Sequence, residues 1–173
     1  MRSLLALVPS LLFVPAAFAD CRAAVGGSGL SAVVSKADHR ALESLLGQVD
    51  DVVCAFMNGS RFGFAPRKSG FFVLTPDEVV FVRDHKTMEV LFRSKFADIG
   101  RFGWNAFGYP SIPEFEDQFR LEILIVGGED FSFTLTCAGG AARLVNELVR
   151  RWTSNTGFRV SRPPGLPPSP PCS

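Results

Sequence analysis

The chain has 173 residues, and its 18 Lys and Arg nearly balance its 17 Asp and Glu, giving a formal net charge of +1. This balance excludes the basic composition of a general nucleic-acid binder, because phosphate binding depends on an excess of Lys and Arg. With 47% hydrophobic and 20% charged residues, the composition is that of a folded chain and excludes a largely disordered one. The length suits a single domain.

The first 19 residues have the pattern of a secretory signal peptide. Arg2 is followed by an apolar stretch from Leu4 to Val14 and by small residues at Ala17 and Ala19, where we expect cleavage. No later apolar stretch reaches the length of a membrane-spanning helix. We therefore expect a secreted or periplasmic protein whose mature chain has no transmembrane segment.

All four cysteines lie in the mature part of the chain. In an oxidising compartment an even number of cysteines favours disulfides, and four cysteines allow three pairings. We favour Cys54 with Cys137 inside the fold and Cys21 with Cys172 joining the tails. The alternative is that Cys54 and Cys137 are buried free thiols.

Residues 20–34 are rich in glycine and are expected to form a flexible linker. A short amphipathic helix is expected to start at Ser35, because Asp38 three residues later completes a pattern like a capping box and apolar residues then recur at helical spacing. Gly47 weakens the end of this helix.

Short runs of β-favouring residues follow the helix, separated by turn signals such as Thr75-Pro76-Asp77-Glu78. Further on, apolar residues alternate with polar ones on both sides of a Gly127-Gly128 turn, which predicts two antiparallel strands with one face buried. The expected strands are residues 52–57, 70–74, 79–82, 88–92, 96–102, 119–125 and 131–137.

Residues 141–152 return to helical spacing, with one apolar stripe from Ala141 to Trp152. We expect this amphipathic helix to close a domain that covers residues 35–157. The remaining residues, 158–173, contain six prolines and are expected to be a disordered tail.

Six or seven antiparallel strands with a short N-terminal helix and a C-terminal capping helix predict an α+β fold that is mostly β, a small barrel plugged by the last helix. In the segment Gly70–Val82, in Ser94–Gly100 and in the final hairpin and helix, the sequence resembles bacterial pleckstrin-homology-like domains related to GRAM domains. The resemblance covers residues 35–153. The signal peptide and a long insert at residues 104–117 depart from the family pattern.

Catalytic patterns are scarce. His39 and His85 do not fall in a spacing typical of metal ligands, and no nucleophile stands in a known motif. We therefore expect a non-enzyme with neither metal nor cofactor.

The segment after the first strand carries three basic residues, Arg61, Arg67 and Lys68, beside Phe62 and Phe64. In pleckstrin-homology domains the loop at this place supplies basic groups to phosphoinositide headgroups, so the resemblance implies an anionic-lipid site here. Cations can hold a phosphate while the rings enter the lipid interface. The alternative is an ordinary hairpin loop whose rings pack on the core.

A second segment, interpreted as a loop over residues 101–110, combines an arginine with several aromatic residues. Arginine with aromatics is typical of protein interfaces, although the segment could instead cover the sheet as a lid. The candidate partner-binding residues are Arg101, Phe102, Trp104, Phe107 and Tyr109.

Together these patterns predict an exported, non-catalytic binding or scaffolding module at the cell envelope or outside it. Its expected ligand is an anionic lipid headgroup or an envelope protein. The alternative is a carrier that holds a small apolar ligand inside the barrel. Asn58-Gly59-Ser60 is a sequon whose use depends on the producing cell.

Overall fold

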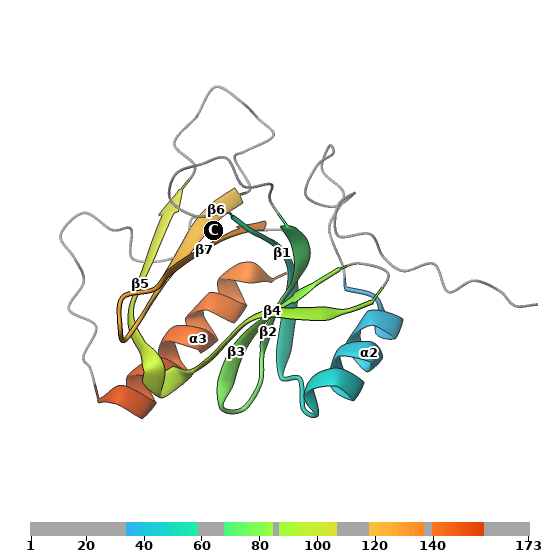
Figure 1. The fold of residues 1–173 in the computed structure, drawn as a ribbon, viewed down its shortest axis with the longest axis horizontal. Coiled ribbons are helices and arrows are strands. Elements are labelled where there is room, and N and C mark those ends of the chain that lie inside the picture. Colours follow the sequence, from blue (N-terminus) through green and yellow to red (C-terminus); the bar gives the residue numbers. More distant parts are fainter. Residues whose placement is uncertain (1–33, 59–67, 85–86, 107–117, 137–139, 158–173) are drawn as a thin grey trace, which may run out of the picture.

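The computed structural model describes residues 34–58, 68–84, 87–106, 118–136 and 140–157. In these ranges seven strands form one antiparallel sheet in the order β4-β3-β2-β1-β7-β6-β5, with one helix near each end of the described chain (Figure 1). The predicted α+β class, mostly β, is confirmed. The elements are α2 (Lys36–Leu46), β1 (Asp51–Met57), β2 (Lys68–Leu74), β3 (Glu78–Arg83), β4 (Glu89–Lys95), the 3-10 turn η1 (Phe96–Asp98), β5 (Ile99–Ala106), β6 (Gln118–Ile125), β7 (Asp130–Thr136) and α3 (Ala141–Thr156).

Helix α2 begins with the predicted capping box. The Ser35 hydroxyl accepts a hydrogen bond from the Asp38 N–H at 3.1 Å and donates one to the Asp38 carboxylate at 2.6 Å. The same carboxylate accepts the Ser35 N–H at 3.3 Å. Aspartate therefore performs here the role that glutamate usually has in this motif. The helix ends where Gly47 takes a φ of 89°, a backbone conformation that glycine adopts without strain.

Helix α3 lies on the concave side of the bent sheet and fills it (Figure 1). Phe133 on β7 is at the centre of this main core, with ring centroids 4.9 Å from Phe72 on β2, 5.6 Å from Phe81 on β3 and 5.3 Å from Phe92 on β4. The apolar stripe of α3, including Leu144, Leu148 and Trp152, packs against these rings. The described interior is thus occupied by side chains, which gives no support to a carrier of an internal apolar ligand.

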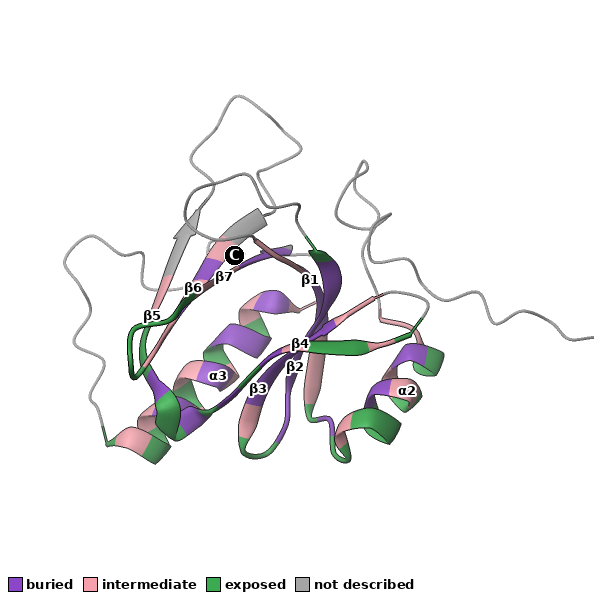
Figure 2. Ribbon diagram, in the orientation of Figure 1, coloured by how far each residue is buried: buried purple, intermediate pink, exposed green. Residues whose placement is uncertain are grey.

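Helix α2 covers the opposite face of the first three strands. Leu42 packs there in a second apolar cluster with Phe71, Val73, Val80 and Val82. Strands β2 and β3 are therefore buried on both faces (Figure 2). This double burial explains why their sequences are continuous apolar runs and do not alternate as β6 and β7 do.

Two predicted boundaries are wrong. The strand expected at residues 96–102 begins only at Ile99, because Phe96–Asp98 form the turn η1, with the Phe96 N–H bound to the Asp77 carbonyl at 3.2 Å. The segment from residue 101 was expected to be a loop, but β5 continues to Ala106 and pairs with β6. Phe102, Trp104 and Ala106 alternate with polar or small residues. This alternation indicates a strand, and the prediction of a loop did not take it into account.

Strands β4 and β5 are the two ends of the sheet and are joined through η1. Over its described length the sheet is thus a half-open barrel whose seam lies between these strands. Indole Nε1 of Trp152 donates to the carbonyl of Ile99 at 2.7 Å, which anchors α3 at the closed end of this seam.

Charged residues fasten α3 to the beginning of β1 and to the β2–β3 turn. The guanidinium of Arg151 donates to Glu147 on its own helix, to Asp50 before β1 and to the Thr75 carbonyl, each at 2.7 Å. Arg143 forms a second pair with Asp51, also at 2.7 Å. Bidentate and shared guanidinium contacts of this kind fix geometry more than they add stability.

Hydrogen bonds from Arg150 and Arg151 lower the pKa of Glu147 to about 2. A carboxylate whose pKa is depressed on folding contributes stability above its unfolded pKa, and this contribution is lost as pH falls toward the folded value. We expect the variant Glu147→Gln to be less stable than the wild type by less than about 1 kcal/mol at neutral pH. The difference should shrink between pH 4.5 and pH 2. Urea titrations across that range measure it, and a difference that grows toward acid would contradict the assignment.

Candidate functional site

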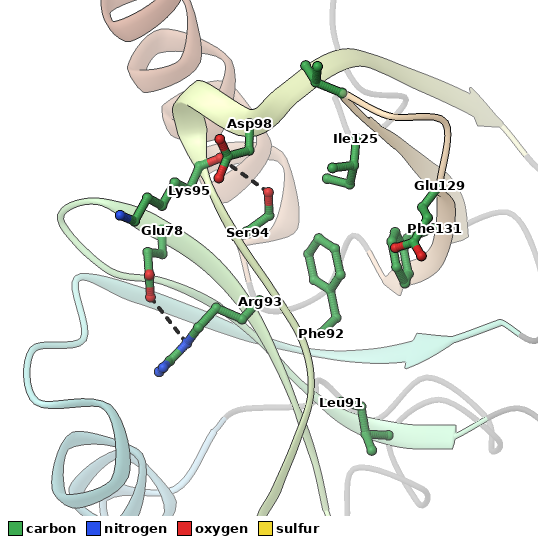
Figure 3. A pocket seen from close by; sticks show the side chains of 11 residues that line it. Glu78, Leu91, Phe92, Arg93, Ser94, Lys95, Asp98, Ile125, Glu129 and Phe131 are labelled. Atoms are coloured by element: carbon green, nitrogen blue, oxygen red, sulfur yellow. Dashed lines mark hydrogen bonds and ion pairs between the residues drawn. The ribbon is translucent and has the colours of Figure 1, made fainter.

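An open cleft of about 580 Å³ lies at the seam between the two halves of the sheet (Figure 3). One wall is the end strand β4, and the other is the tip of the β6–β7 hairpin. We call it the β4 cleft. Its lining residues are Glu78, Leu91, Phe92, Arg93, Ser94, Lys95, Asp98, Ile125, Val126, Glu129 and Phe131.

The cleft has an aromatic floor. The rings of Phe92 on β4 and Phe131 on β7 lie 4.6 Å apart, measured between centroids, and Ile125 lies beside them (Figure 3). Phe92 also packs against Phe133 of the main core. The floor is therefore held rigidly by the core, which is the condition for a preformed binding surface.

The hairpin tip forms the opposite wall. Gly127 and Gly128 take φ values of 115° and 103°, which only glycine adopts readily. The Val126 N–H donates to the Asp98 carbonyl at 2.8 Å, so the tip is fastened to η1. This bond leaves the Val126 side chain on the outside, with 70% of its surface exposed.

One strongly exposed apolar side chain lines the cleft. Among the described residues the large hydrophobic side chains with substantial exposure are Leu45 on α2, Val90 on β4 and Val126 on the hairpin. Of these three only Val126 lines the cleft. Val90 lies opposite Val82, whose side chain belongs to the cluster beneath α2. Apolar surface that is rimmed by charge is typical of interaction sites.

Charges surround the apolar floor. The Arg93 guanidinium pairs with Glu78 at 3.2 Å, and about half of the Arg93 side chain is exposed. Lys95, two residues further along β4, is also exposed. Among the residues that the structure describes, no histidine or cysteine lines the cleft, and the hydroxyl of Ser94 donates to the Lys95 carbonyl at 3.2 Å. The lining is chemically suited to binding.

The predicted lipid-binding residues fall mostly outside the described ranges. Arg61, Phe62, Phe64 and Arg67 lie there, and only Lys68 is described, as the exposed first residue of β2. The anionic-lipid site stays a prediction.

The structure describes only part of the predicted partner-binding set. Arg101 is exposed on β5, whereas the ring of Phe102 packs against Trp152 at 4.9 Å between centroids. Trp104 belongs to β5, and Phe107 and Tyr109 lie outside the described ranges. Of the two residues whose side chains are described, Arg101 and Phe102, neither lines the β4 cleft.

Cys54 is buried on β1, and Cys21, Cys137 and Cys172 lie outside the described ranges. The preferred pairing therefore stays a prediction.

The side chain of Asn58, in the sequon, forms two hydrogen bonds with strand β7. Its amide nitrogen donates to the Ser132 hydroxyl at 3.1 Å, and its oxygen accepts the Thr134 hydroxyl at 3.2 Å.

Two kinds of feature are absent from the described part of the chain. No group of three or more His, Cys, Asp or Glu side chains there could hold a metal ion. No helix in that part is both long and apolar enough to cross a membrane.

Comparison with known proteins gives a likeness in structure only. No family model matches the sequence, and no curated protein matches it. Among solved structures, the chain is similar to one described as "Structural analyses of Slm1-PH domain demonstrate ligand binding in the non-canonical site", with 9% identity over 63% of this chain and 98% of that one, at a TM-score of 0.40. The chain's own strand order and C-terminal helix form the arrangement of a pleckstrin-homology-like domain.

Sequence reasoning missed the β4 cleft. Its two walls come from residues 89–95 and 125–131, which only the bent sheet brings together. One signal was available in the sequence. Val126 is an apolar residue at the tip of a glycine-rich hairpin, where polar residues are usual.

Proposed function

We propose that this chain is a non-catalytic binding module that holds a segment of a partner protein in the β4 cleft. The observation that carries the proposal is the exposed apolar side chain of Val126 beside the rigid floor of Phe92 and Phe131. An aromatic floor in a concave site with polar groups at its edge is the usual composition of a protein-binding hot spot.

We propose further that the module works after export, at the cell envelope or outside it, as the signal-peptide pattern of residues 1–19 predicts. One observation supports a disulfide at Cys54 in that setting, since no cysteine among the described residues has a free thiol. We propose Cys137 as its partner.

Selection of random linear peptides on residues 20–173 tests the proposed function. We expect most selected peptides to lose binding to the variant Val126→Asp and to keep binding to Leu45→Asp. The two variants are matched, because each places a carboxylate at an exposed apolar position, and Leu45 lies on α2, outside the lining of the cleft. Selection of no peptide, or of peptides indifferent to Val126→Asp, would sink the proposal.

Liposome sedimentation of the same protein tests the anionic-lipid alternative. Selective binding to anionic vesicles that is lost in the triple variant Arg61→Ala, Arg67→Ala, Lys68→Ala would favour that alternative. If instead the module binds proteins through the cleft, we expect the wild type and the triple variant to sediment equally little with either kind of vesicle.

A further inference from the structure

The end strand β4 carries main-chain groups that point away from the sheet. The Phe96 N–H is bound to the Asp77 carbonyl, and β4 pairs with β3 in the register that places Lys95 opposite Glu78 and Ser94 opposite Val79. In an antiparallel ladder, hydrogen-bonded pairs alternate with pairs that are not hydrogen-bonded. Phe92 and Ser94 therefore bind to β3, and the N–H and C=O groups of Arg93 and Lys95 point outward. The Lys95 C=O also accepts the Ser94 hydroxyl at 3.2 Å, which leaves one of its two lone pairs for a further bond.

These outward groups border the β4 cleft. Arg93 and Lys95 both line it, and β4 is the last strand of the sheet on this side. An end strand with outward donors and acceptors can accept one more strand. The register shift near Leu91 interrupts the regular ladder, so the uninterrupted part of the edge is the short stretch from Phe92 to Lys95.

The side chains of this stretch specify what the added strand should carry. Phe92 and Ser94 are buried toward the core, whereas Arg93 and Lys95 are exposed on the other face. Residues opposite one another in neighbouring strands share a face and interact. An added strand with apolar residues toward Phe92 and acidic residues beside Lys95 and Arg93 would match both faces, the Arg93 guanidinium being shared with Glu78. The carboxylates of Asp98 and Glu129, which also line the cleft, belong to η1 and to the opposite wall.

We propose that the β4 cleft binds an extended segment of a partner protein, with alternating apolar and acidic residues, as an added antiparallel strand beside Phe92–Lys95. This proposal rests on the proposed function and specifies its mode of binding. We expect the added segment to pair antiparallel with β4, because antiparallel pairing is the more stable arrangement and every neighbouring pair of strands in this sheet is antiparallel. A second copy of β4 is a poorer occupant, because in the register that joins the outward groups Arg93 of each copy would face Lys95 of the other, a pair of like charges.

The test uses a capped peptide, acetyl-Thr-Val-Glu-Val-Glu-Val-Thr-amide, titrated into residues 20–173 by calorimetry. In the proposed arrangement the amides of the two Glu residues face β4, and those of the Val residues face away. N-methylation of both Glu amides should raise the Kd by at least about tenfold, from the loss of two hydrogen bonds. N-methylation of the last two Val amides should change the Kd by less than about threefold. Any other pattern, or no binding of the parent peptide, overturns the proposal.

A variant of the protein tests the same contact from the other side. Arg93→Pro removes an outward N–H and leaves the hydrogen bonds to β3 in place, which is where proline is tolerated in an end strand. We expect it to lose at least about tenfold in affinity, and Arg93→Gln, which keeps the N–H, to lose less. Equal affinities of the two variants would contradict strand addition.

The two proposals fail differently. If peptides selected from the random library need Val126 but none responds to the position of N-methylation, the cleft binds proteins and strand addition is wrong. If no library peptide binds in the cleft, the proposed function itself is wrong.

Discussion

Replacing Gly70 by alanine is expected to unfold the domain or to lower its free energy of unfolding by more than about 3 kcal/mol. A Cβ at this position would lie 2.1 Å from the Val82 carbonyl oxygen and 3.0 Å from the Arg83 Cα. Both atoms are backbone of the neighbouring strand β3, which pairs with Gly70 through Arg83. The clash is therefore relieved only by separating β2 from β3.

Gly100→Ala is the matched control for this variant. Its Cβ would meet nothing closer than the Leu124 carbonyl oxygen at 3.5 Å, an ordinary contact distance. We expect its stability to stay within about 1 kcal/mol of the wild type. Urea unfolding followed by circular dichroism measures both variants. If Gly70→Ala has the same free energy of unfolding as the wild type, β2 does not approach β3 as closely as described.

Replacing Phe133 by alanine is expected to cost about 3–5 kcal/mol, out of a total stability of about 5–15 kcal/mol for a domain of this kind. The side chain is fully buried and its ring touches those of Phe72, Phe81 and Phe92. Removal leaves a cavity between the sheet and α3 that these rings cannot fill without leaving their own contacts.

Phe133→Leu provides the graded comparison, because it keeps most of the apolar volume and removes the ring contacts. Its loss of stability should be clearly smaller than that of Phe133→Ala. The alanine variant should also weaken peptide binding, since Phe92, which rests on Phe133, forms the floor of the β4 cleft. Urea titration gives the stabilities, and equal stability of all three proteins would contradict the central position of Phe133.

Local patterns were enough to predict most of the fold. Alternation in β6 and β7, the capping box at Ser35 and the apolar stripe of α3 each report the immediate surroundings of a residue, so the sequence predicts them directly. The polar end of β4, Arg93 to Lys95, was missed because its one inward side chain is that of Ser94, and a polar residue does not mark a buried face in the sequence.

The candidate site was harder to predict, for a physical reason. A cleft between β4 and the β6–β7 hairpin depends on how far the sheet bends, and no local pattern of residues reports that curvature. Phe102 is a second case in which the local sequence does not report the position of a side chain in the fold. Its neighbours Arg101 and Trp104 suggested an interface, but its position on β5 places the ring against Trp152.

The cover that α2 provides over β1–β3 has a consequence for aggregation. The segments 70–74 and 79–82 are uncharged, rich in Phe and Val, and central in the sheet, the composition from which cross-β aggregates form. In the folded chain one face of these segments is sealed by α3 and the other by α2. Helix α2 thus protects the sheet from self-association, and a chain shortened to begin after it would present Phe71, Val73, Val80 and Val82 to its neighbours.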